Sequence, residues 1–146
     1  MFKKLILIHL LFFAFCTNGF AEGMSVAFTG AEIRSAPSAI SSKVIFKASK
    51  YYPLTVTKKD TEYYLVSDYR GKSGYIHKSL LKPQPAVIVT KDKANVRSGS
   101  GTTQKVVFQL SQGETARLIG KNDGWVEIET AEGQKGWIAE FLVWGD

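Results

Sequence analysis

The sequence predicts an all-β protein made of two tandem small β-barrels that follow an N-terminal signal peptide. Short apolar stretches alternate with turn residues at intervals typical of strands, and the second half of the chain repeats the first at a nearly constant spacing. The predicted organisation is a signal peptide at 1–21, a first barrel at 22–82, a linker at 83–85 and a second barrel at 86–146.

The first 21 residues have the three-part layout of a secretory signal. Lys3 and Lys4 precede an apolar run over 5–15, and small residues follow at Gly19 and Ala21. An uncleaved anchor is the alternative, but the run is shorter than the roughly 20 residues that a spanning helix needs. We therefore expect cleavage near Ala21 and a periplasmic or secreted protein with no membrane span.

The cysteine content depends on this cleavage. Cys16 leaves lipidation open as an alternative, although lipoprotein signals as a family have a small residue in the place of Phe15. If Cys16 is removed, the mature chain has no disulfide, no thiolate nucleophile and no cysteine-based metal site. His77 is then its only histidine, and we expect no cofactor and no metal.

The second unit contains five short extended stretches, at 94–97, 105–110, 114–119, 125–129 and 136–139. Gly99 and Gly101 lie in the loop after the first stretch, and Gly133 lies in the turn before the last. Alternation along the strands predicts a core on one face. Its expected members are Val96, Val106, Phe108, Leu118, Val126, Ile128 and Ile138.

The first unit repeats this pattern. Residues 31–35 precede their counterparts by 63 positions, and from Lys43 onward the spacing is 62, so one extra residue lies in the loop between Ser35 and Lys43. A slip confined to a loop is what two copies of one fold should show, since loops tolerate insertions and paired strands do not.

These residues resemble the bacterial SH3-like (SH3b, Src-homology-3) domain family. The second unit has its pattern A-x-V-R-S-G, V-x-x-x-L-x-x-G, G-W-x-x-V and G-x-x-G-W-I with a trailing leucine, with Ile128 in the valine place of G-W-x-x-V. Ser100 replaces the usual proline. The resemblance implies an SH3-like barrel and a role as a cell-wall or peptide-binding module, as in many exported proteins.

The first unit departs from the family pattern. Ala36 and Pro37 replace the glycine-bearing loop, Tyr51 replaces the turn glycine, and Tyr63 and Tyr75 replace the two signature tryptophans. We expect the same fold with a differently shaped surface.

Net charge also distinguishes the two units. Split at Pro83, the chain from Glu22 has 10 basic and 5 acidic residues in the first half but 7 and 8 in the second. The excess of basic residues suggests that the first unit prefers anionic surfaces, through residues such as Lys43, Lys58 and Lys72. The alternative is a basic surface that only keeps the protein soluble.

The connection between the two units contains Pro83 and Pro85, which make it short and extended.

The motifs of common enzymes are missing. The sequence has no P-loop, no dinucleotide fingerprint and no metal-ligand spacing. His77 is expected to be solvated just past a strand, and Glu127 and Glu129 to solubilise an exposed strand face. Nucleic acid is discounted as a partner because an exported protein would rarely meet it.

Recognition therefore falls to aromatic residues on the outward strand faces. If Val126 and Ile128 point inward, Trp125 points outward, and Trp137 is outward when Ile138 is inward. A hairpin would place Glu127 opposite Trp137 and Trp125 on the diagonal, forming a platform for peptides or sugars. Tyr63 and Tyr75 take the matching places in the first unit; capping of the barrel ends is the alternative role.

We therefore expect a non-catalytic exported protein whose tandem SH3-like modules recognise a cell-envelope ligand, such as peptidoglycan stem peptide or an envelope protein. The alternative is a structural adaptor pair in an envelope protein complex. The sequence leaves the ligand, the partner protein and the oligomeric state open.

Overall fold

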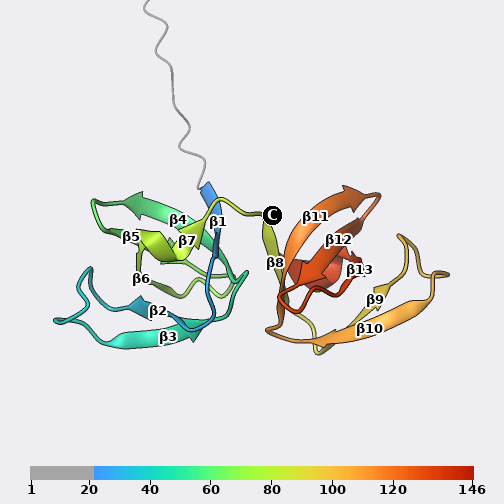
Figure 1. Ribbon diagram of the computed structural model, residues 1–146, viewed down its shortest axis with the longest axis horizontal. Helices are drawn as coiled ribbons and strands as arrows, with labels where there is room; N and C mark the ends of the chain where they lie inside the picture. The colour runs from blue at the N-terminus through green and yellow to red at the C-terminus, as the bar shows by residue number, and fades with distance from the viewer. Residues whose placement is uncertain (1–21) are drawn as a thin grey trace, which may run out of the picture.

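The computed structural model describes residues 22–146, so the predicted signal peptide and Cys16 lie outside the described residues. Two seven-stranded antiparallel sheets lie side by side along the chain (Figure 1). The sheet of the first unit contains β1 (Glu22–Val26), β2 (Ala31–Arg34), β3 (Val44–Ala48), β4 (Pro53–Lys59), β5 (Tyr63–Ser67), β6 (Ser73–His77) and β7 (Leu81–Lys82), with the 3₁₀ helix η1 (Lys78–Leu80) before β7.

The second unit has the same elements in the same order. They are β8 (Ala86–Val89), β9 (Lys93–Arg97), β10 (Val106–Ser111), β11 (Thr115–Asn122), β12 (Trp125–Thr130), β13 (Lys135–Ala139), η2 (Glu140–Leu142) and β14 (Val143–Trp144). The strands are ordered β3-β2-β6-β5-β4-β1-β7 and β10-β9-β13-β12-β11-β8-β14. The all-β class and the repeated unit are confirmed, whereas closure of each sheet into a barrel stays a prediction.

Irregularities of the sheets repeat as well. The β2–β3 ladder shifts register between Phe46 and Val44, and the β9–β10 ladder shifts between Phe108 and Val106, 62 residues later. Ser35 donates a backbone hydrogen bond to Lys43, and Ser98 donates one to Lys105. These bonds close a loop that is one residue longer in the first unit, as the sequence spacing predicts.

The second core contains most of the expected residues. Val96, Val126, Ile128 and Ile138 are buried, and Phe108 and Leu118 pack against them while remaining partly exposed. The prediction for Val106 is wrong, because its side chain is 38% exposed. The bulge at Val107 breaks the alternation of β10, so that Phe108 pairs with buried Val96 but Val106 pairs with half-buried Arg97.

The remaining core positions come from residues that the predicted list omits. Val87, Val89, Ala94, Leu110 and Ala116 complete the second cluster. All four residues of β8 are buried, so this strand is covered on both faces.

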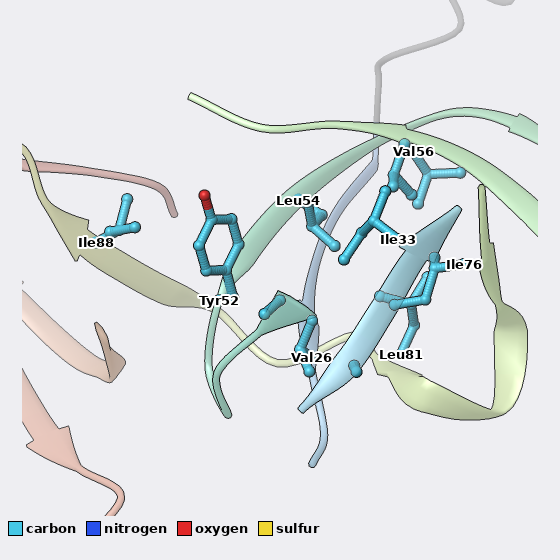
Figure 2. Close-up of a cluster of buried hydrophobic side chains, with 11 residues drawn as sticks. Val26, Ile33, Tyr52, Leu54, Val56, Ile76, Leu81 and Ile88 are labelled. Carbon is cyan, nitrogen blue, oxygen red and sulfur yellow. The ribbon is translucent and has the colours of Figure 1, made fainter. Parts of the chain in front are cut away.

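The other face of β8 joins the two units. Ile88 is 1% exposed and belongs to the buried cluster of the first unit, which it approaches from the side of Tyr52 (Figure 2). Trp144, paired with Ile88 across the β8–β14 ladder, packs against the same cluster, and its ring lies 6.4 Å from that of Tyr69. The second unit therefore contributes side chains to the first unit's core.

Hydrogen bonds also cross the junction. The Thr115 hydroxyl donates to the Lys50 carbonyl at 2.7 Å and lies 3.1 Å from the Ser49 hydroxyl. The Ser25 hydroxyl donates to the carbonyl of Gln84 in the linker at 2.8 Å. Apolar contact and polar contact together fix the relative orientation of the two units.

One glycine in each unit is required by close packing. A Cβ on Gly74 would lie 2.4 Å from Cγ2 of Ile33, and a Cβ on Gly136 would lie 2.6 Å from Cγ1 of Val96. Real Cβ atoms do not approach so closely, so only glycine lets β6 and β13 cross their core strands. This explains the glycine that precedes Tyr75 and Trp137.

Candidate binding faces

The predicted hairpin of the second unit is confirmed. In the β12–β13 ladder Glu127 pairs with Trp137 and Trp125 pairs with Ala139. Val126, Ile128 and Ile138 are at most 1% exposed, so both indoles lie on the opposite face of these strands, where they are half-buried.

The two indoles do not stack. Within residues 22–146 there is no ring contact between Trp125 and Trp137, although they share a face of one hairpin. The same holds for Tyr63 and Tyr75 in the first unit. The predicted joint platform thus consists of two aromatic positions on one face, and its role in binding stays a prediction.

The first unit has a groove of about 340 Å³ along this face. Tyr63 lines it, and the ring of His77 meets that of Tyr63 edge to face at 5.2 Å. The remaining lining includes Phe28, which is 57% exposed, Leu80, and the ion pair of Arg34 with Glu32. An aromatic and aliphatic floor therefore meets polar groups at its edges.

His77 is more engaged than the sequence suggests. It is the last residue of β6 rather than a residue beyond the strand, and it pairs with Tyr63 in the ladder. Its Nδ1 lies 2.7 Å from the Ser79 hydroxyl and accepts from the Ser79 amide, while its Nε2 lies 3.1 Å from the Glu62 carboxylate. The His77 side chain is 36% exposed, in line with the expected solvation, and in addition it caps η1 and bridges to Glu62.

The second unit places apolar residues at the same positions. Sixty-two residues after Tyr63, His77 and Ser79 stand Trp125, Ala139 and Phe141. Phe141 is 77% exposed on η2. The aromatic residue therefore stands beside hydrogen-bonded polar side chains in the first unit, and beside a buried alanine and an exposed phenylalanine in the second.

Tyr75 and Trp137 lie beside arginines. Tyr75 pairs with Arg34 across the β2–β6 ladder, and Trp137 pairs with Arg97 across the β9–β13 ladder. Arg97 donates to the Gln104 carbonyl at 2.9 Å, and Arg34 donates to the Ala39 carbonyl at 3.2 Å. In both units an arginine thus anchors the loop next to the second aromatic position.

The first unit contains a buried carboxylate, Asp68, that the sequence analysis does not predict. The Asp68 side chain is 0% exposed; it accepts from the Tyr52 hydroxyl at 3.1 Å and from Arg70 Nη2 at 2.6 Å. Burial raises the pKa of Asp68, but the hydrogen bonds from Arg70, Lys72 and Tyr52 outweigh it and hold the pKa below its ordinary value. Burial, followed by the nearby Asp68 charge, raises the pKa of Tyr52.

This carboxylate organises a cationic, aromatic corner. The Arg70 guanidinium lies 5.5 Å from the ring centroids of Phe46 and Tyr69, and the Lys72 ammonium lies 5.4 Å from that of Phe46. At the matching positions the second unit has Thr130 for Asp68 and Glu132 for Arg70.

The Glu129 carboxylate is held by two basic side chains. Arg117 Nη2 contacts the Glu129 carboxylate at 2.5 Å, and Lys135 Nζ lies 3.6 Å from the same carboxylate. The pKa of Glu129 is lowered, chiefly by the hydrogen bond from Arg117.

Among residues 22–146 no three His, Cys, Asp or Glu side chains gather as a metal site. Nor does any helix in that range have the length and apolarity to cross a membrane.

The chain belongs to the bacterial SH3 domain family, whose sequence pattern matches residues 29–82 and 92–143. The resemblance seen in the sequence, with two tandem copies, is thereby confirmed. The matched ranges contain both aromatic faces.

Two similar proteins are longer chains that this one matches over a part of their length. YrvJ of Bacillus subtilis (strain 168), named as an N-acetylmuramoyl-L-alanine amidase, is 29% identical over 65 residues, which are 44% of this chain and 12% of YrvJ. LytH of Staphylococcus aureus, named as a cell wall amidase, is 34% identical over 53 residues, which are 36% of this chain and 18% of LytH. The chain thus spans under a fifth of these relatives.

A solved structure shows a more distant likeness. The NlpC/P60 family protein from Bacillus cereus ATCC 10987 is 14% identical, with a TM-score of 0.40 over 85% of this chain and 56% of that protein. This TM-score is too low to support any inference about function.

Proposed function

We propose that this protein is a non-catalytic, exported cell-wall-binding protein whose tandem SH3 domains recognise a peptide-bearing component of peptidoglycan. The groove beside Tyr63 and His77 carries the proposal, because it is the hollow that coincides with a predicted aromatic position. The names of YrvJ and LytH support it, since both are named as amidases and LytH as a cell wall amidase.

The size and lining of the groove favour a small part of a larger ligand. Its volume of about 340 Å³ lies at the lower end of the roughly 300 to 1,000 Å³ typical of ligand sites. Tyr63, Phe28 and Leu80 offer apolar surface for a side chain or a sugar face, and Glu32 and His77 offer polar contacts at the edge. A stem peptide presents both kinds of group.

The non-catalytic part of the proposal rests on the hydrogen bonds of His77. Ser79, His77 and Glu62 form a chain that could in principle relay a proton, with Nδ1 accepting and Nε2 donating to the carboxylate. However, the Ser79 amide donates to the same Nδ1, so the arrangement caps η1. We expect the protein to release no product from sacculi, and Ser79→Ala to leave binding unchanged.

An adaptor function is the second candidate, and the open face of the second unit favours it. Phe141 is 77% exposed next to the strands that carry Trp125, and exposed aromatic surface often marks a protein contact. In that case the second unit docks an envelope protein while the first unit stabilises it through the shared core.

The test is sedimentation of the mature protein with purified sacculi, in parallel with capture of envelope proteins on the immobilised protein. The proposal predicts saturable co-sedimentation that free peptidoglycan fragments compete away. Absence of co-sedimentation together with specific capture of one envelope protein would contradict it and select the adaptor function.

A further inference from the structure

A small pocket in the first unit shares no lining residue with the groove beside Tyr63, although Phe28 of that groove lies next to Lys82 of the pocket. It is lined by the end of β1, by β7 and the linker that follows, and by the turn between β3 and β4. The side chains that matter for its chemistry are Lys50 and Tyr51 in the turn, Lys82 on β7 and Gln84 in the linker.

The volume of the pocket limits what it can hold. At about 130 Å³ it has room for roughly four water molecules, each of which occupies about 30 Å³ in the liquid. That is below the roughly 300 Å³ at which drug-sized ligands begin to fit. The pocket can therefore receive a single functional group of a larger molecule.

The charge of the pocket is positive and uncompensated. Neither Lys50 nor Lys82 forms an ion pair with any carboxylate in the described part of the chain. Their ammonium groups lie over aromatic rings, Lys50 at 4.9 Å from the Tyr51 centroid and Lys82 at 5.9 Å from that of Phe28. An ammonium group has three N–H donors, so one that faces a ring leaves others for an anion.

The backbone at Tyr51 is unusual. Tyr51 has φ 65°, in the left-handed region that disfavours a residue with a Cβ, and at the equivalent position the second unit has Gly113 with φ 87°. A turn alone would be served better by glycine. Strained positions of this kind persist where surrounding contacts hold them and often occur at ligand sites; here the strained residue lines the pocket.

The junction between the units holds this turn in place. The Tyr51 amide donates to the Val26 carbonyl at 2.8 Å, and Thr115 of the second unit donates to the Lys50 carbonyl at 2.7 Å. Lys50 and Lys82 have no basic counterparts in the second unit, where Gln112 and Trp144 occupy the matching places. The pocket is therefore a property of the first unit that depends on its contact with the second.

We propose that this pocket binds an oxyanion, either a phosphate ester or a carboxylate, carried by an anionic polymer of the cell envelope. Lys50 and Lys82 neutralise the charge. Tyr51 and Gln84 complete the lining, and the Gln84 side-chain amide, which donates one hydrogen bond to the Pro85 carbonyl at 3.4 Å, has a second N–H for the anion. This site is additional to the proposed peptidoglycan contact and does not depend on it.

The experiment is an NMR titration of the isotopically labelled protein with inorganic phosphate, at an ionic strength held constant with sodium chloride. We expect saturable shifts centred on the amides of Lys50, Tyr51 and Lys82. Lys50→Ala and Lys82→Ala should each raise Kd at least fivefold, whereas Lys58→Ala, an exposed lysine outside the pocket, should change it less than twofold. Shifts that do not saturate, or an equal effect of Lys58→Ala, would overturn the proposal.

Two further variants separate geometry from charge. Tyr51→Gly restores the residue type of the second unit, and Thr115→Val removes the bond to the Lys50 carbonyl; both keep the lysines, and both should raise Kd at least threefold. Unchanged affinity in both variants would contradict a built site. A parallel titration with acetate distinguishes the source, since tighter phosphate binding indicates phosphate esters and tighter acetate binding indicates carboxylates.

Discussion

The two units of this protein share one topology and one set of β-bulges, yet their equivalent surfaces differ in chemistry. Where the first unit has Tyr63 and His77, the second has Trp125 and Ala139. All six tyrosines lie in the first unit and all three tryptophans in the second. The inward-facing residues keep the fold in both copies, which frees the outward faces to differ.

The two units also differ in what each contributes to the junction between them. The second unit buries Ile88 in the first unit's core and packs Trp144 against it, whereas the second cluster contains buried residues of the second unit alone. The copies are therefore unequal partners in stability: the first depends on the second for part of its core. Each prediction below tests one difference between them.

The largest effect is expected from Ile88→Ala. Truncating a fully buried isoleucine typically costs about 2 to 5 kcal/mol of the free energy of unfolding. Because Ile88 belongs to the first unit's core, tyrosine signals of the first unit should shift as far as tryptophan signals of the second in denaturant unfolding. Ile119→Ala, at an exposed position of the second unit, is the control. A loss confined to the tryptophan signal would show that the units fold separately.

Asp68→Asn should have the next largest effect. Removing the charge that accepts from Arg70 should cost about 2 kcal/mol at neutral pH. The folded pKa of Asp68 is lowered, so the stabilisation is present above the unfolded value of about 3.9 and is lost as pH falls through the folded pKa. The wild type should thus lose stability below about pH 4, and the variant should lack this component.

The control for the carboxylate is Thr130→Val at the matching place in the second unit. Thr130 accepts a hydrogen bond from the Gln134 amide at 3.2 Å, a neutral interaction worth about 1 kcal/mol. Thermal unfolding between pH 2 and 7 should show no change in the acid dependence for this variant. If Asp68→Asn leaves the acid dependence unchanged as well, the network around Asp68 is not its source.

The smallest effect concerns the basic surface of the first unit. Lys43→Ala and Lys58→Ala should each weaken binding to sacculi by less than about 1 kcal/mol at low salt and by nothing measurable at high salt, because exposed charges are screened over about 8 to 10 Å. Lys93→Ala in the second unit should have no effect at either salt concentration. Equal effects of lysines from both units would show that the charge asymmetry does not steer binding.

The sequence predicts the repeat, the strands, the single-residue loop insertion and the hairpin register, because these follow from alternation and spacing. It does not predict that Val106 is exposed, since a bulge is not visible in an apolar run. Nor does it predict the place of Ile88, because a strand buried on both faces shows no alternation to indicate which core each residue joins.

The candidate site is predictable only in part. Alternation identifies Tyr63 and Trp125 as outward aromatic residues, but the groove beside Tyr63 also needs Phe28, His77 and Arg34 from other strands and loops. Contacts between residues so far apart in the chain depend on the folded topology. The buried Asp68 is missed for the same reason, because its partner Tyr52 lies 16 residues earlier in the chain, in the turn between β3 and β4.

The central claim is that the two equivalent aromatic faces contact the cell wall, and its most direct test is binding of Tyr63→Ala and Trp125→Ala to purified sacculi. Circular dichroism must show both variants folded, and Gln112→Ala, outside both faces, is the control. Truncating a central aromatic contact typically costs about 2 kcal/mol, so each variant should lose roughly 30-fold in affinity at low and high salt. If both folded variants bind as tightly as the wild type, the aromatic faces are not the binding site.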